Sequence, residues 1–173
     1  MKVQILLVLI FALNIILIWS AAKYKWLIWY TCLGGLVFVL LPLFGVFFTQ
    51  PYFVLDHFWW QVVGILAILV GMSVIAWAIM AQKTSGCSLC GLSEKFVPSG
   101  PYRFVRHPLY LGLIFIYIGW WWIWATVYSF YFGMLIVLLI WLQAWLEEKY
   151  LLENKYGQAY SAYKKNTGMF WIK

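Results

Sequence analysis

The residues best suited to chemistry lie in one stretch, GPYRFVRHPLYLG, from Gly100 to Gly112. It holds two arginines, a histidine and two tyrosines between long hydrophobic blocks. Proline lacks an amide donor and favours extended geometry in the residue before it, so we expect non-helical chain near Pro101 and at Arg106–His107. Pro108 suits the first turn of a helix, whose amino end would attract an anionic group. A basic boundary on the cytoplasmic side of a membrane would have a similar composition.

A second group of candidates is the acidic pair Glu147 and Glu148, which follows a long apolar block. If Pro108–Leu146 forms a helical hairpin, the pair returns to the surface at which Arg106 and His107 begin it. The glutamates could form a structural ion pair with Arg106, or they could line a polar pocket that opens toward lipid. Charged groups at membrane depth are costly, so a functional role is the default hypothesis.

Cys87 and Cys90 form a CxxC pair shortly before this stretch. A structural zinc site needs four ligands, and only His107 lies near enough in sequence to offer a third. No strand–helix pattern supports a thioredoxin-like motif either. We therefore assign no metal ligand. The sequence also lacks a glycine-rich phosphate loop, a nucleophile elbow and an HExxH motif, which removes the common templates of soluble enzymes.

The whole chain has the composition of an integral membrane protein. Its 173 residues are 66% hydrophobic and only 10% charged, and its net charge is +7. The basic residues lie at the ends of apolar blocks, which indicates membrane topology and not nucleic-acid binding. A helical span takes roughly 20 apolar residues. We expect five such spans: Val3–Ser20, Leu27–Thr49, Trp59–Ala81, Pro108–Val127 and Tyr128–Leu146.

We therefore expect an all-α integral membrane fold in a single domain, residues 1–173. Gly64 and Gly71 in the third span would allow close helix approach. The first block could instead be a cleaved signal peptide, because small residues follow it. The expected parts are three N-terminal spans (1–81), a cytoplasmic connection (82–107), a helical hairpin (108–146) and a cytoplasmic C-terminal segment (147–173).

The orientation follows from the lysines and arginines, which concentrate in the first and third connections and in the C-terminal tail. Positive residues stay cytoplasmic, so with five spans the N-terminus lies outside and the C-terminus and candidate site lie in the cytoplasm. Trp59–Trp60 and Trp120–Trp124 then fall together at the outer ends, as an interfacial belt would require.

The C-terminal segment carries an aromatic stripe that Gly157 interrupts. The segment could lie on the membrane surface as an amphipathic helix, or it could fold back as a lid over Arg106–His107, and the stripe is compatible with both. The stripe recurs at spacings of four, four and three: Leu152, Tyr156, Tyr160 and Tyr163.

GPYRFVRHPLYLG, followed by a hydrophobic hairpin and then EEKYLLENKYGQAYSAY, resembles the isoprenylcysteine carboxyl methyltransferase family and the related phospholipid N-methyltransferases. The resemblance implies a membrane methyltransferase that uses S-adenosylmethionine. Its partners would be the lipid bilayer and a lipophilic acceptor, either an isoprenylcysteine carboxylate or a lipid. Two other classes stay open: an NADPH-dependent membrane reductase of the sterol reductase type and a non-enzymatic membrane scaffold.

The resemblance also implies site residues. Arg106 and Glu148 would be catalytic. Aromatic rings near the cofactor would suit its sulfonium through cation–π attraction. The C-terminal GMFWIK departs from the basic, proline-containing end of the prenylcysteine enzymes, which leaves the acceptor open. The implied cofactor-binding residues are His107, Tyr110, Gly112, Glu147, Glu148, Tyr160 and Tyr163.

Overall fold

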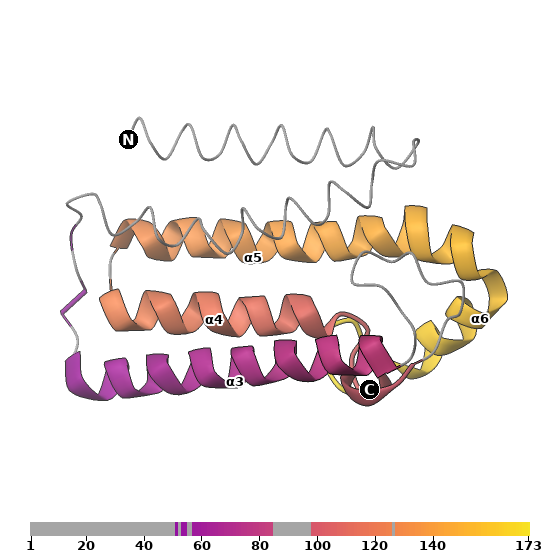
Figure 1. Cartoon of the computed structure of the whole chain (residues 1–173). Helices are drawn as coiled ribbons and strands as arrows, with labels where there is room; N and C mark the ends of the chain where they lie inside the picture. The colour runs from indigo at the N-terminus through magenta and orange to yellow at the C-terminus, as the bar shows by residue number, and fades with distance from the viewer. Residues whose placement is uncertain (1–50, 52, 55–56, 85–97, 126) are drawn as a thin grey trace.

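The computed structural model describes residues 51, 53–54, 57–84, 98–125 and 127–173, and the regular structure in these ranges is helical (Figure 1). The expected all-α fold is therefore confirmed for this part of the chain. The first two expected spans and the CxxC pair lie outside it. The elements in order are α3 (His57–Thr84), the 3₁₀ turn η2 (Gly100–Arg103), α4 (Pro108–Trp124), α5 (Val127–Glu147), the π-helical turn η3 (Glu148–Leu152) and α6 (Glu153–Asn166).

Three long helices, α3, α4 and α5, lie side by side and alternate in direction (Figure 1). Within α3, the 26 residues Phe58–Lys83 are long and apolar enough to cross a membrane. Helix α4 is apolar but has only 17 residues. It ends at Trp124, before the expected Val127, because Ala125 adopts a left-handed conformation (φ 48°) and its amide closes the last turn onto Trp121 O at 2.7 Å. The turn into α5 is short, as the hairpin prediction required.

Two glycine pairs bring α3 and α4 into backbone contact. A Cβ built on Gly64 would lie 2.6 Å from Gly119 O, and one built on Gly71 would lie 2.5 Å from Gly112 O. Real Cβ atoms do not approach other atoms so closely, so these four positions require a residue without a side chain. The expected close approach at Gly64 and Gly71 is confirmed, and its partners are glycines on α4 with the same seven-residue separation.

We expect Gly119→Ala to lower the free energy of unfolding by about 1–3 kcal/mol, the usual effect of overpacking. The new methyl group would overlap Gly64 O and lie 2.8 Å from Ile68 Cγ1, so the two helices would have to separate. Chemical unfolding of the protein in detergent micelles measures this. Ala76→Leu adds more volume on the exposed side of α3 and is the control; an equal loss in both variants would contradict the packing argument.

The end of the bundle opposite the candidate site is closed by aromatic rings. Trp60 and Trp122 stack with ring centroids 5.5 Å apart, so the two tryptophan groups do share one end. Phe53 packs edge-on against Trp121 and Phe130, at 6.0 and 5.9 Å. This arrangement joins α3 to the α4–α5 turn. The side of the membrane on which it lies stays a prediction.

At the other end, the chain leaves α5, passes through η3 and turns back toward the start of α4 in α6 (Figure 1). Gly157 breaks α6 with non-helical angles (φ 54°, ψ −125°), as its place in the aromatic stripe suggested. The residues after α6, 167–170, which we call the return segment, pair with the stretch before α4. Arg106 N donates to Gly168 O at 2.9 Å and His107 N donates to Met169 O at 3.2 Å. Of the two alternatives for the C-terminal segment, the fold-back is the one observed.

Candidate active site

The basic stretch supplies two functional side chains from a short non-helical run before α4. His107 is the N-cap of α4 and has non-helical angles (φ −124°, ψ 63°), and Pro108 is the first helical residue, as predicted. The expectation of non-helical chain near Pro101 was wrong, because Gly100–Arg103 forms a 3₁₀ turn. Proline is tolerated there, since its missing amide lies in the first turn, where no helical partner is needed. Arg106 and His107 are thus held in non-helical chain between two helical segments.

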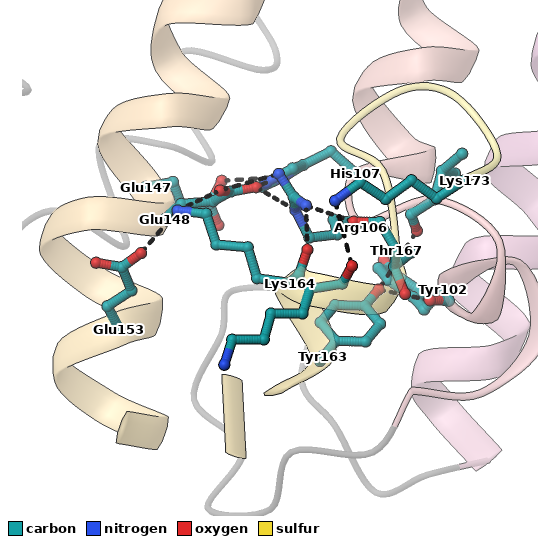
Figure 2. A network of polar contacts seen from close by, with 12 residues as sticks. Tyr102, Arg106, His107, Glu147, Glu148, Glu153, Tyr163, Lys164, Thr167 and Lys173 are labelled. Carbon is teal, nitrogen blue, oxygen red and sulfur yellow. Dashed lines mark hydrogen bonds and ion pairs between the residues drawn. The ribbon is translucent and has the colours of Figure 1, made fainter. Parts of the chain in front are cut away.

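Glu148 is the centre of the polar cluster (Figure 2). Its side chain is 1% exposed. Arg106 donates to it from two nitrogens, Nε to Oε1 at 2.7 Å and Nη2 to Oε2 at 3.3 Å. His107 Nε2 lies 3.0 Å from Oε1. Lys164 Nζ, from α6, lies 3.3 Å from Oε2. One buried carboxylate therefore joins the start of α4, the end of α5 and the end of α6.

Arg106 also holds the return segment. Its third guanidinium nitrogen, Nη1, donates to Lys164 O at 3.2 Å and to Thr167 O. The side chains of Arg106 and Thr167 are buried, and carbonyl oxygens at the end of α6 have no further amide to accept from within that helix. The planar guanidinium can serve all these acceptors together because its donors point in fixed directions.

Glu147 forms a second and more accessible polar group, since 23% of its side chain is exposed. Tyr110 Oη donates to Glu147 Oε2 at 3.0 Å, and Gln143 Nε2 donates to Tyr110 Oη at 3.1 Å. The Tyr110 ring stacks on the His107 ring with centroids 5.5 Å apart. The two adjacent glutamates therefore occupy different environments: Glu148 is enclosed by cations, and Glu147 faces a tyrosine and partly faces solvent.

Gln143 was not among the sequence candidates. It lies four residues before Glu147, a spacing that places both side chains on one face of α5. A lone glutamine inside an apolar block is the signal that could have found it.

The aromatic residues of α6 lie over this cluster. Tyr163 donates its hydroxyl to Tyr102 O, and Val105 O lies 3.5 Å away. Tyr160 is 1% exposed and its ring centroid lies 5.9 Å from that of Tyr163. Both tyrosines belong to the predicted set, and the fold-back of α6 is what brings them to the α4 junction.

Gly112 is the one predicted site residue that the contacts place elsewhere. It packs on α3, where a Cβ would lie 2.5 Å from Ile75 Cγ1 and 2.8 Å from Gly71 O. Its visible role in the structure is helix packing. The other predicted residues lie in or over the polar cluster.

The comparison with known families bears on this arrangement. The sequence profile of phospholipid methyltransferase matches residues 59–159, which is more than half of the chain. The chain belongs to the phospholipid methyltransferase family. No curated protein and no solved structure gives a significant match. The resemblance is thus confirmed at the level of the family, and the match covers GPYRFVRHPLYLG and the C-terminal motif as far as residue 159.

The phospholipid methyltransferase match runs from the start of α3 into α6 and contains the Arg106–Glu148 and Tyr110–Glu147 contacts. Membership makes methyl transfer the class of reaction and makes a membrane location the expected one. The long apolar helix α3 agrees with that location. The match gives no support to a reductase.

In this member of the phospholipid methyltransferase family, the groups around Glu148 favour the ionised form of its carboxyl. Burial alone would raise the pKa of the carboxyl, but hydrogen bonds from His107 and Arg106 outweigh it and lower the pKa from 4.5 to about 2. At neutral pH the group is therefore an anion that holds cations. A carboxylate with so low a pKa is a weak base, so a proton-accepting role does not suit it.

The α6 side of the cluster is charged as well. A hydrogen bond to Glu153, at 2.7 Å, is the main cause that raises the pKa of Lys164. Burial raises the pKa of Tyr160 and of Tyr163, so both hydroxyls stay protonated. The aromatic residues over the cluster thus remain neutral, and their rings can face a cation without adding negative charge.

Proposed function

We propose that this protein is an S-adenosylmethionine-dependent membrane methyltransferase that acts on a lipophilic acceptor, either an isoprenylcysteine carboxylate or a lipid. The observation that carries the proposal is the polar cluster around Glu148 and Glu147, closed by α6, in a chain of the phospholipid methyltransferase family. The cofactor would lie at the end of the α4–α5 hairpin, beneath α6. We further propose that this end faces the cytoplasm and that the chain crosses the membrane several times.

The donors and acceptors of the cluster fit this cofactor, which would supply the methyl group bound to a positively charged sulfur. Glu147 is partly exposed and would accept hydrogen bonds from the cofactor amino group or ribose. His107, at the amino end of α4, would meet the carboxylate. The rings of Tyr110, Tyr160 and Tyr163 would face the sulfonium. Gly112 would act in this set by keeping α4 close to α3.

The catalytic contribution of Arg106 and Glu148 would be positioning. Transfer of a methyl group needs an in-line approach in a pocket with little water, so much of the rate comes from holding the reactants in line. The Arg106–Glu148 pair joins all the segments that carry the proposed ligand-binding residues. A carboxylate acceptor needs no base. For an amine acceptor, His107 is the group in this cluster best suited to take the proton.

We expect the purified full chain in detergent to bind S-adenosylmethionine, and His107→Ala to weaken that binding about tenfold or more, as loss of a charge-assisted hydrogen bond does. Isothermal titration calorimetry measures the affinity. The control is His57→Ala, at the start of α3. Bound S-adenosylmethionine should be displaced by its demethylated product and not by NADPH.

Two results would contradict the proposal. Absence of binding by the unchanged protein would remove the function, and equal affinity in His107→Ala and His57→Ala would remove the site. The acceptor is then sought with radiolabelled S-adenosylmethionine, offered with total membrane lipid in one arm and a prenylcysteine analogue in the other.

A further inference from the structure

Gln143 is a buried polar residue in the apolar part of α5. Its side chain is 3% exposed, and its neighbours along the helix include Leu139, Ile140 and Ala144, all of them buried. Burying an amide in such surroundings is unfavourable unless the amide is hydrogen-bonded. If only packing mattered here, leucine would fill the same space without that penalty. The hydrogen bonds of the side chain must therefore account for a glutamine at this position.

The direction of those hydrogen bonds follows from the chemistry of the three groups. A tyrosine hydroxyl has one proton to donate, and a carboxylate can only accept. Tyr110 therefore gives its proton to Glu147 Oε2, at 3.0 Å, and accepts from Gln143 Nε2, at 3.1 Å. If the amide were turned around, its oxygen would compete with Glu147 for the same proton. Only one orientation of Gln143 satisfies both contacts.

The hydrogen bonds from Gln143 to Tyr110 and from Tyr110 to Glu147 affect the orientation of the Glu147 carboxylate. The described contacts of Glu147 all use Oε2, which accepts from Tyr110 and lies 4.0 Å from His107 Nδ1. Tyr110 is itself fixed from two sides, because its ring stacks on His107 and packs against the buried apolar cluster of α4 and α5. With Oε2 engaged by these contacts, Oε1 is the oxygen of Glu147 that would accept a hydrogen bond from a ligand.

We propose that Gln143 is a positioning residue for the Glu147 carboxylate and acts through Tyr110. By donating to Tyr110, it directs the tyrosine proton to Glu147 and keeps that carboxylate oriented to accept hydrogen bonds from the cofactor. The inference rests on the proposed function, because S-adenosylmethionine is the ligand assumed for Glu147. It differs from a purely structural role, in which the cost of a charge buried at position 143 would not require the Tyr110 hydroxyl.

The test uses Gln143→Glu in the full-length protein, with affinity for S-adenosylmethionine measured by calorimetry between pH 5.5 and 8.5. A protonated carboxyl at this position can donate to Tyr110 as the amide does. An ionised one can only accept, so it draws the Tyr110 proton away from Glu147. Because an ionised carboxylate is unfavourable in these apolar surroundings, the neutral form should persist at the acidic end, where we expect near-normal affinity, with a loss of about tenfold or more as the pH rises.

Three further variants serve as controls for the Gln143→Glu measurement. Gln143→Leu removes the donor at similar size and should weaken binding roughly fivefold at every pH, as loss of a single hydrogen bond would. Gln61→Leu makes the same exchange on the exposed side of α3 and should change nothing. In Tyr110→Phe the link to Glu147 is already broken, so adding Gln143→Glu should produce no further dependence on pH.

The outcomes separate the two proposals. A wild-type protein that binds no S-adenosylmethionine overturns the proposed function and this inference with it. Wild-type binding together with the wild-type pH profile in Gln143→Glu overturns this inference alone, as does the same pH-dependent loss in the Tyr110→Phe background. If Gln143→Leu fails to fold, the pH series of Gln143→Glu still decides, because recovery at low pH occurs within one variant.

Discussion

Glu148→Gln is expected to lower the free energy of unfolding at neutral pH by about 3–5 kcal/mol, the usual effect of removing one partner from a buried ion pair. The carboxylate is buried, and Arg106 and His107 contact it at 2.7 and 3.0 Å. Glutamine keeps the size but removes the charge, so the arginine is left buried without a counter-ion. Chemical unfolding in detergent micelles measures the change. Binding of S-adenosylmethionine should be lost with it, because the same contacts hold His107 in place.

The matched control is Glu153→Gln, in which the replaced carboxylate also contacts Lys164, at 2.7 Å. Both of these side chains are 38% exposed, and exposed ion pairs contribute about 1 kcal/mol or less. The two variants thus remove a carboxylate from the same lysine but differ in burial. Equal destabilisation would mean that Glu148 is not the buried centre described above.

The pH dependence of the Glu148 effect has a definite sign. The pKa of Glu148 is lowered from 4.5 to about 2 in the folded protein, chiefly by hydrogen bonds from His107 and Arg106 that overcome the effect of burial. A group with a lowered folded pKa stabilises the protein above its unfolded pKa and loses that contribution as the pH falls. Wild type and Glu148→Gln should therefore differ most above pH 4.5 and converge as the pH approaches 2. A difference that stays constant over this range would contradict the assignment.

The main architecture of the site could be predicted because it depends on long-range features of the chain. Arg106 and Glu148 are 42 residues apart, and the hairpin of two apolar helices between them places both ends at one surface. Hydrophobic block length and the proline at the start of α4 were enough for that prediction. The same reasoning predicted the glycine contacts of α3, because glycine within an apolar helix is best explained by a close neighbour.

Finer features could not be predicted because they depend on the rotation of each helix about its axis. Adjacent glutamates point about 100° apart on a helix, so sequence alone could not tell that Glu148 meets Arg106 while Glu147 meets Tyr110. The contact of Lys164 depends on the break at Gly157, whose positive φ redirects α6. The sequence marks Gln143 as a lone polar residue in an apolar block, but its contact with a tyrosine on another helix depends on the same rotation.

Arg106→Lys is the second substitution with a large expected effect, although it conserves the charge. Arg106 donates to both oxygens of Glu148 and, through Nη1, to Lys164 O and Thr167 O. A lysine ammonium can satisfy the carboxylate as a point charge but cannot reach acceptors on opposite sides at once. Hydrogen bonds to charged groups contribute about 1.5–3 kcal/mol each, so losing the two carbonyl contacts should release the return segment.

Release of the return segment can be measured by limited trypsin digestion in micelles, because Lys164 and Lys165 precede it. We expect cleavage there to be about tenfold faster or more in Arg106→Lys, since freeing the segment by about 1.4 kcal/mol raises the open population tenfold when opening is fast. Arg103→Lys, at an exposed position of η2, is the control and should leave that cleavage unchanged. Because the return segment holds the backbone of His107 through Met169 O, affinity for S-adenosylmethionine should fall in parallel with faster cleavage. Faster cleavage with normal affinity would show that closure of the C-terminal segment is separate from ligand binding, and unchanged cleavage would show that Arg106 is not what holds it closed.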